Sequence, residues 1–117
     1  MKFPKISFGD EWNNLKKFEN LSDFERSIVF YAENKASMNH FRTLIFELTE
    51  RMNFQICYIT SVKNDPIFSS KNKNILSFYV GEGASRTKFF LTLRAKILVM
   101  DMPDLDTYHI KRSKAYP

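Results

Sequence analysis

The chain has 117 residues, of which 44% are hydrophobic and 26% are charged, and this length suits one domain or one half of a larger protein. The single cysteine, Cys57, excludes an intramolecular disulfide framework and a zinc site of the CxxC type. No apolar run approaches the roughly 18 residues that a membrane-spanning helix needs, and the first residues lack the apolar core of a secretory signal. The composition therefore predicts a soluble, cytoplasmic globular chain.

Positive charge is concentrated in the second half of the chain. Residues 1–60 carry 8 Lys and Arg and 8 Asp and Glu, whereas residues 61–117 carry 10 and 5, so the second half holds the whole net charge of +5. Such an excess is typical of proteins that meet an anionic partner, such as a phosphate group, a nucleic acid or an acidic membrane surface. A solvated lysine-rich surface produces the same excess and is the simpler interpretation from charge alone.

Residues 1–24 are predicted to be a helical lead-in to the domain. Apolar residues from Trp12 to Phe24 recur at every third position, a spacing that drifts around a helix of 3.6 residues per turn. A helix over residues 11–19 that breaks near residues 20–23 fits this spacing better than one long helix. Lys16 and Lys17 would let this helix lie on a membrane surface, and packing on its own domain is the alternative.

Residues 25–117 are predicted to form a single α/β domain. Its strands are apolar, β-rich runs of the kind that both faces of a parallel sheet bury: residues 27–32, 55–60, 74–80 and 96–100. One helix is expected to begin at Ser37 or Asn39 and to reach Met52, and a shorter one runs from Ser85 to Arg94. The order β-α-β-β-α-β predicts a Rossmann-like parallel sheet with flanking helices.

Ligands of such sheets bind where the carboxyl ends of the parallel strands meet. At this edge Gly81 and Gly83 precede a predicted helix, whose free N–H groups favour an anion. Arg86 and Lys88 would then supply the positive charge. Because a dinucleotide-binding loop needs a small residue where this chain has Arg86, a plain tight turn is the alternative interpretation.

Three carboxylates, Asp101, Asp104 and Asp106, follow the fourth predicted strand directly. Carboxylates in that position can hold Mg²⁺ together with a diphosphate, although acidic residues beside a proline more often cap a helix. Neither His40 nor His109 has a serine or cysteine nucleophile at a recognisable spacing, and Cys57 is expected to be an inert core residue. We therefore expect neither a metal ion nor a cofactor.

Several short segments follow one another in a fixed order between residues 26 and 114. They are residues 30–33 (FYAE), 57–61 (CYITS), 64–66 (NDP), 72–75 (NKNI), 77–81 (SFYVG), 86–87 (RT) and 102–113 (MPDLDTYHIKRS). In order and spacing they resemble the amino-terminal part of the CDP-glycerol glycerophosphotransferase-like proteins of bacterial teichoic acid and related cell-surface polymer synthesis. Residues 102–113 carry the sharpest part of the resemblance.

The resemblance implies a GT-B architecture, in which two Rossmann-like domains face a cleft. In that family the amino-terminal domain serves the acceptor and the carboxy-terminal domain binds CDP-glycerol. Glycerol phosphate is transferred to a lipid-linked acceptor at the cytoplasmic face of the membrane. The family's catalytic histidines and nucleotide-binding residues lie beyond the point that matches Ser113, so no catalytic residue is assigned. We therefore expect residues 25–117 to be a truncated acceptor-side domain that is inactive alone.

The expected partners are a lipid-linked or phosphorylated polymer acceptor, the inner membrane surface and a missing carboxy-terminal half, but not a nucleic acid. If the resemblance holds, one cleft wall contains the predicted substrate-binding residues, which are His40, Asp104, His109, Lys111 and Arg112. A frayed basic tail over residues 108–114 is the alternative for the last three. A stand-alone α/β binding module for an anionic ligand or a partner subunit is the alternative function.

Overall fold

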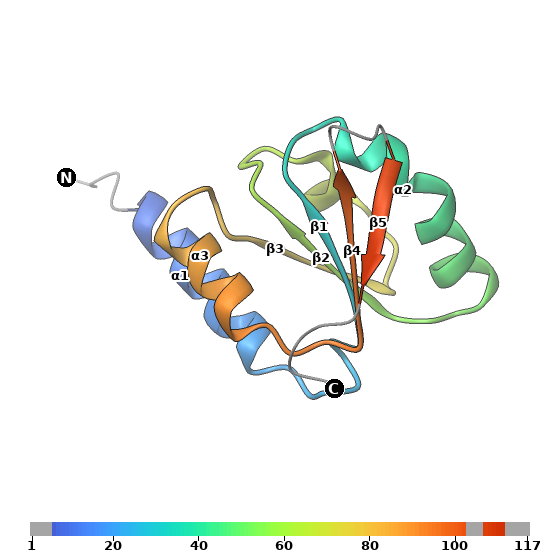
Figure 1. Cartoon of the computed structure of the whole chain (residues 1–117), viewed down its shortest axis with the longest axis horizontal. Coiled ribbons are helices and arrows are strands. Elements are labelled where there is room, and N and C mark those ends of the chain that lie inside the picture. The colour runs from blue at the N-terminus through green and yellow to red at the C-terminus, as the bar shows by residue number, and fades with distance from the viewer. Residues whose placement is uncertain (1–5, 103–106, 112–117) are drawn as a thin grey trace.

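The structure is a computed structural model that describes residues 6–102 and 107–111, with side chains described for residues 10–100. Figure 1 shows a sheet with helices on both of its faces. The elements in chain order are α1 (Ile6–Glu19), β1 (Ile28–Ala32), α2 (Ser37–Phe46), a π-helical turn (Glu47–Arg51), β2 (Ile56–Thr60), a 3-10 helix (Pro66–Ser69), β3 (Ile75–Tyr79), α3 (Ala84–Thr92), β4 (Ile97–Met102) and β5 (Thr107–Lys111).

The sheet has the strand order β3-β2-β1-β4-β5. The first four strands in this order are parallel, and β5 pairs with β4 in the antiparallel direction. All four predicted strands are present, so the prediction of a small α/β fold with a parallel sheet and flanking helices is confirmed. The arrangement is consistent with a Rossmann-like sheet.

Two separate cores explain why β1 is apolar along its whole length and β2 along most of its length. Alternate residues of a strand point to opposite faces of the sheet. Val29 and Tyr31 of β1 therefore pack under α1 and α3, whereas Phe30 and Ala32 pack under α2. Because helices cover both faces, apolar side chains are favoured in both sets. Figure 1 shows α1 and α3 together on one side of the sheet and α2 on the other.

Helix α1 is an integral part of the domain. It begins at Ile6, earlier than the predicted start at residue 11, and ends at Glu19 as predicted. Leu15 and Phe18 are almost fully buried, and the Phe18 ring lies edge-on to Phe78 of β3 and to Phe89 of α3. Of the two interpretations for this helix, packing on its own domain is the one that the structure shows.

Strand β5 was not expected from the sequence. Residues 108–114 were predicted to form either a cleft wall or a frayed basic tail, whereas Thr107–Lys111 forms the edge strand of the sheet. The polar, alternating sequence TYHIK suits an edge strand better than a buried one. The basic residues in this segment concealed that pattern.

The connection between β2 and β3 is the irregular part of the fold. Residues 61–74 were predicted to be a loop, and their only helical segment is the 3-10 helix Pro66–Ser69. Asp65 caps this segment, because its carboxylate accepts a hydrogen bond of 3.0 Å from the backbone N–H of Ile67. This connection therefore adds no α-helix beside α2 on that face of the sheet.

Candidate functional site at the carboxyl edge of the sheet

Two hollows lie side by side at the carboxyl ends of the parallel strands. The first has a volume of about 660 Å³ and is bordered by Lys35, Ser61, Tyr79 and Glu82 among others. The second, of about 390 Å³, lies between β1, β4 and α3. Glu33, directly after β1, lines both hollows.

The second hollow lies at the switch point of the sheet. The connection that leaves β1 crosses one face of the sheet through α2, and the connection that reaches its neighbour β4 crosses the other face through α3, so the strand order reverses between β1 and β4. Ligands of open α/β sheets bind in this kind of crevice. Its lining residues are Tyr31, Glu33, Arg86, Thr87, Phe90, Leu91 and Met100.

A chain of hydrogen bonds joins the strand ends beneath the two hollows. The Ser61 hydroxyl donates its proton to the carbonyl of Gly81, which can only accept. The Tyr31 hydroxyl, 2.6 Å from Ser61 Oγ, must therefore be the donor in that pair. Tyr31 Oη in turn accepts from Arg86 Nη1 at 3.4 Å. Donation runs in one direction, from α3 through β1 and the end of β2 to the end of β3.

This chain of bonds fixes Arg86 as the cation of the second hollow. The hydrogen bond to Tyr31 is the largest influence that raises the pKa of the Arg86 guanidinium, and the nearby carboxylates of Glu33 and Glu82 act in the same direction. The side chain is only partly exposed. Arg86 thus presents a permanent positive charge at the switch point, with two carboxylates around it.

The glycine turn before α3 is already occupied by a carboxylate of the chain itself. Gly81 has a positive φ of 69°, and a Cβ atom at that position would overlap the carboxylate of Glu11. Glu11 Oε1 lies 3.4 Å from the hydroxyl of Ser85, in the first turn of α3. The predicted anion position at the start of α3 therefore holds Glu11, and the turn joins α1 to α3. The structure favours the tight turn over a phosphate loop.

Tyr79 belongs to the same joint between α1 and the sheet. Its backbone N–H donates to Asn14 Oδ1 of α1 at 3.0 Å. Burial has the largest effect on its phenol, and together with the negative charge of Glu11 it raises the pKa of Tyr79. Tyr79 is therefore a protonated phenol at neutral pH that lines the first hollow.

Lys88, the second cation expected at the glycine turn, points elsewhere. Its Nζ atom lies 3.8 Å from Glu19 Oε2 and 5.9 Å from the centre of the Trp12 ring. These partners belong to α1, so Lys88 ties the two helices together. Of the two cations predicted for this turn, Arg86 alone lines a hollow of the carboxyl edge.

Three of the five predicted substrate-binding residues, His40, His109 and Lys111, lie in the described part of the backbone. His40 lies in the first turn of α2 and lines neither hollow. In β5, His109 pairs with Met100, a lining residue of the second hollow, but Lys111 pairs with Leu98 farther from the carboxyl edge. The antiparallel direction of β5 causes this separation. Asp104 and Arg112 lie outside the described residues.

Of the three carboxylates expected after the fourth strand, Asp101 belongs to β4 itself, where it pairs with Tyr108 of β5, and Asp104 and Asp106 lie outside the described residues. Among residues whose side chains are described, no group of three His, Cys, Asp or Glu is close enough to hold a metal ion. Within the same range, none of the helices has the length and apolar character needed to cross a bilayer.

Tyr31 and Ser61 were not singled out as partners by sequence reasoning. Tyr31 lies in an apolar run and was taken for a core residue, which it also is, with 2% of its surface exposed. A hydroxyl at the end of a buried strand, here Ser61, was the available signal. Their pairing depends on the parallel register of β1 and β2, which places Ala32 opposite Thr60.

Comparisons with family models, with curated proteins and with solved structures found no match to this chain. The resemblance to the glycerophosphotransferase-like proteins therefore stays a prediction that the segments between residues 26 and 114 carry.

Proposed function

We propose that the chain binds a small phosphorylated polyol at its carboxyl edge, as the acceptor-side domain of a CDP-glycerol glycerophosphotransferase-like protein. The observation that carries the proposal is Arg86, held by Tyr31 at the switch point of the sheet. A guanidinium group is suited to a phosphate because its planar donors match two phosphate oxygens. The second hollow, at about 390 Å³, is within the size range of small-molecule sites.

The carboxylates around Arg86 favour a ligand that carries hydroxyl groups as well as a phosphate. Glu33 and Glu82 are exposed and border the hollows. Ionised carboxylates only accept hydrogen bonds, so they suit the hydroxyl groups of a polyol and repel a second anion. One cation among two carboxylates fits glycerol phosphate better than it fits a densely charged polyphosphate.

The apolar rim of the second hollow is an argument for a second domain or subunit that covers it. Leu91 is 80% exposed and Phe90 is 37% exposed, and both lie on α3 beside the hollow. Large apolar side chains beside a polar site are typical of surfaces that another protein surface covers. In the proposed function this cover is the CDP-glycerol-binding half, and the acceptor reaches the site from the cytoplasmic membrane face. A partner subunit of another kind is the alternative.

Titration of the ¹⁵N-labelled chain with glycerol 3-phosphate tests the proposal. We expect saturable shifts of the amide signals around Arg86 and Glu33, which added salt weakens. Arg86→Gln should reduce the affinity about tenfold, because it removes one charge-assisted hydrogen bond to the phosphate. Arg94→Gln is the matched control, since Arg94 is an exposed arginine beyond the other end of α3. Equal affinity in both variants, or no saturable shift, contradicts the proposal.

A further inference from the structure

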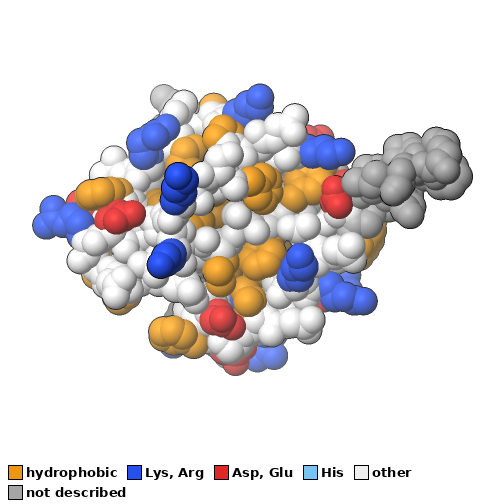
Figure 2. Space-filling model, turned by 180° about the vertical axis from the view of Figure 1, so that it is seen from behind, with side chains coloured by type: hydrophobic (Ala, Val, Ile, Leu, Met, Phe, Trp, Pro, Cys, Tyr) orange, Lys and Arg blue, Asp and Glu red, His pale blue; other side chains and the backbone are white. Residues whose placement is uncertain are grey.

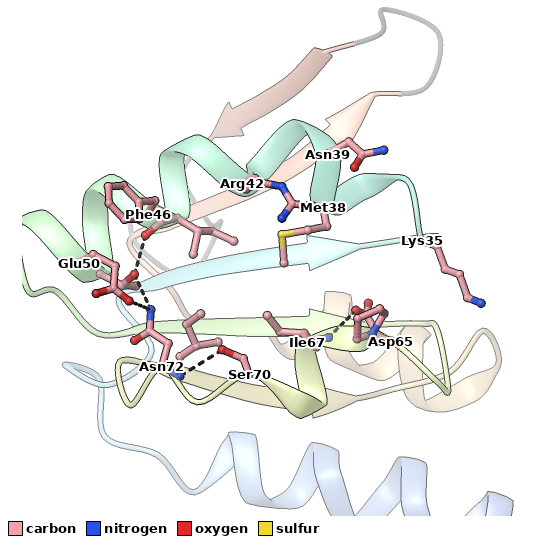
Figure 3. Close-up of a pocket in the computed structure, with 14 residues that line it drawn as sticks. Lys35, Met38, Asn39, Arg42, Phe46, Glu50, Asp65, Ile67, Ser70 and Asn72 are labelled. Carbon is pink, nitrogen blue, oxygen red and sulfur yellow. Dashed lines mark hydrogen bonds between the residues drawn. The ribbon is translucent and has the colours of Figure 1, made fainter.

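A further pocket, separate from the two hollows at the carboxyl edge, lies between α2 and residues 61–74 (Figure 3). Its volume is about 360 Å³. Parallel strands are usually joined by a crossover helix that fills this position. Here the β2–β3 connection has only the short 3-10 helix Pro66–Ser69, and the pocket is the space that a longer helix would fill. We refer to it as the α2 pocket.

The floor and sides of the α2 pocket are apolar. Met38 and Ile45 come from α2, Ile67 from the 3-10 helix and Ile75 from β3. Both carboxylate oxygens of the buried Asp65 already accept a hydrogen bond. One bond comes from the Thr60 hydroxyl at 2.7 Å and the other from the Ile67 backbone N–H. The pocket can therefore take an apolar group without leaving a buried polar atom unpaired.

The end of the pocket farthest from the carboxyl edge is built by the π-helical turn Glu47–Arg51. The amide of Asn72 donates to Thr49 Oγ1 and to Glu50 Oε2, both at 2.8 Å, so residues 61–74 are fastened to this turn. Asn74 adds a bond of 2.9 Å to the carbonyl of Thr49. π-Helical turns are rare and occur often at functional sites. These bonds hold residues 61–74 in place beside the π-helical turn, so the pocket is part of the folded structure.

Charge is divided between the two ends of the α2 pocket. Arg42 and Lys35 are exposed at its rim, and Figure 3 shows Arg42 beside Met38 on α2. Neither cation makes an ion pair with any residue whose side chain the structure describes. Glu50 lies at the opposite end, beside Asn72. An anionic group is therefore favoured near Arg42 and disfavoured near Glu50.

We infer that the α2 pocket binds a small amphipathic anion, in which a phenyl ring or short alkyl chain carries a phosphate or a carboxylate. The apolar part lies against Met38, Ile67 and Ile75, and the anionic group lies at Arg42. This site is independent of the one proposed at the carboxyl edge, because it lies on the other face and uses a different arginine. Lys35 alone borders both.

Phenyl phosphate and phenylacetate are suitable probes, and an amide-shift titration of the full chain locates where they bind. Saturable shifts are expected at Met38, Arg42, Ile67 and Asn72. Inorganic phosphate, which lacks the ring, and benzyl alcohol, which lacks the charge, should each bind at least tenfold more weakly than phenyl phosphate. The comparison of phenyl phosphate with phenylacetate shows which anionic group the pocket prefers.

Two variants separate the charge from the shape of the site. Arg42→Gln should weaken phenyl phosphate binding about tenfold, and Arg94→Gln should leave it unchanged. Met38→Trp should block the pocket and abolish phenyl phosphate binding, and Met38→Leu is the control of similar volume. If the tryptophan variant does not fold, the Arg42→Gln result alone tests the inference, because Arg42 is exposed and its replacement does not disturb the core.

The inference is wrong if the pocket amides show no saturable shift, if Arg42→Gln binds as well as the parent chain, or if either partial probe binds as tightly as phenyl phosphate. Shifts confined to Arg86 and Thr87 would also overturn it while leaving the carboxyl-edge proposal intact.

Discussion

Gly81 connects β3 to α3 with a backbone conformation that suits glycine, at a φ of 69°. We expect Gly81→Ala to lower the free energy of unfolding by about 2 kcal/mol or more, because the added methyl group is strained and meets Glu11. Gly83→Ala is the matched control, since nothing lies within 4 Å of a Cβ atom there. Urea unfolding of the two variants measures the difference. Equal stability of the two variants would contradict the close contact between α1 and this turn.

Cys57 is fully buried in the middle of β2, where its thiol donates to the Glu25 carbonyl at 3.3 Å. Burial is the main cause that raises the pKa of Cys57 from 9.0 to about 12. The thiol of the unfolded chain therefore ionises first as pH rises, and this favours unfolding. The stabilising effect is complete below pH 9 and is lost between about pH 9 and 12.

The parent chain should consequently lose up to about 1.4 kcal/mol more stability per pH unit above pH 9 than Cys57→Ala does. Urea unfolding at a series of pH values from 8 to about 11 measures the two slopes. Because only the slopes are compared, the cavity that alanine leaves does not affect the result. Parallel slopes would show that the thiol ionises freely in the folded chain. The same burial predicts that iodoacetamide modifies Cys57 only after unfolding.

At the scale of the elements, α1 contributes to stability through one face. Phe18 is 2% exposed and contacts the rings of Phe78 and Phe89, whereas Trp12 is 39% exposed. Phe18→Ala should therefore cost about 3–4 kcal/mol, and Trp12→Ala about 1 kcal/mol. Thermal unfolding followed by circular dichroism compares them. A Phe18→Ala chain as stable as the parent would mean that α1 does not belong to the core.

Much of the sheet could be predicted because burial leaves a direct trace in sequence. Strands β1 and β2 are apolar apart from Thr60 and the hydroxyls of their tyrosines, and α2 shows Phe41 and Ile45 on its buried face. The π-helical turn could not be predicted, because it depends on hydrogen bonds from Asn72 and Asn74, more than 20 residues away. The sequence predicted that the site lies at the carboxyl edge and that Arg86 supplies its charge. It could not predict the bond between Arg86 and Tyr31, which depends on how α3 packs.

At the scale of the whole molecule, the face that Figure 2 shows has no dominant patch of charge. There the Lys and Arg side chains stand apart, with hydrophobic and uncharged groups between them. A protein that follows a nucleic-acid backbone usually gathers such residues into a stripe. Local cations such as Arg86 and Arg42 therefore carry the binding proposals.

For the whole molecule, the proposed function predicts no turnover by the chain alone. The position at the start of α3, where a nucleotide phosphate would bind in a dinucleotide-binding sheet, is filled by Glu11. The purified chain, incubated with CDP-glycerol and a glycerol phosphate polymer, should release no CMP above the rate without protein. Acceptor-dependent release of CMP would contradict this prediction, and its loss in His109→Ala would then identify that histidine as part of the reaction.

The one-way chain of hydrogen bonds from Arg86 to Gly81 also bears on the cost of binding. A free arginine side chain loses conformational entropy worth about 2 kcal/mol when a ligand fixes it in one geometry. The Tyr31 hydroxyl, 3.4 Å from Arg86 Nη1, restricts the guanidinium before a ligand binds, so part of that ordering takes place when the chain folds. The site is therefore preorganised. Tyr31→Phe should release the Arg86 side chain and weaken ligand binding through Arg86, and the lost affinity should appear as a less favourable entropy of binding.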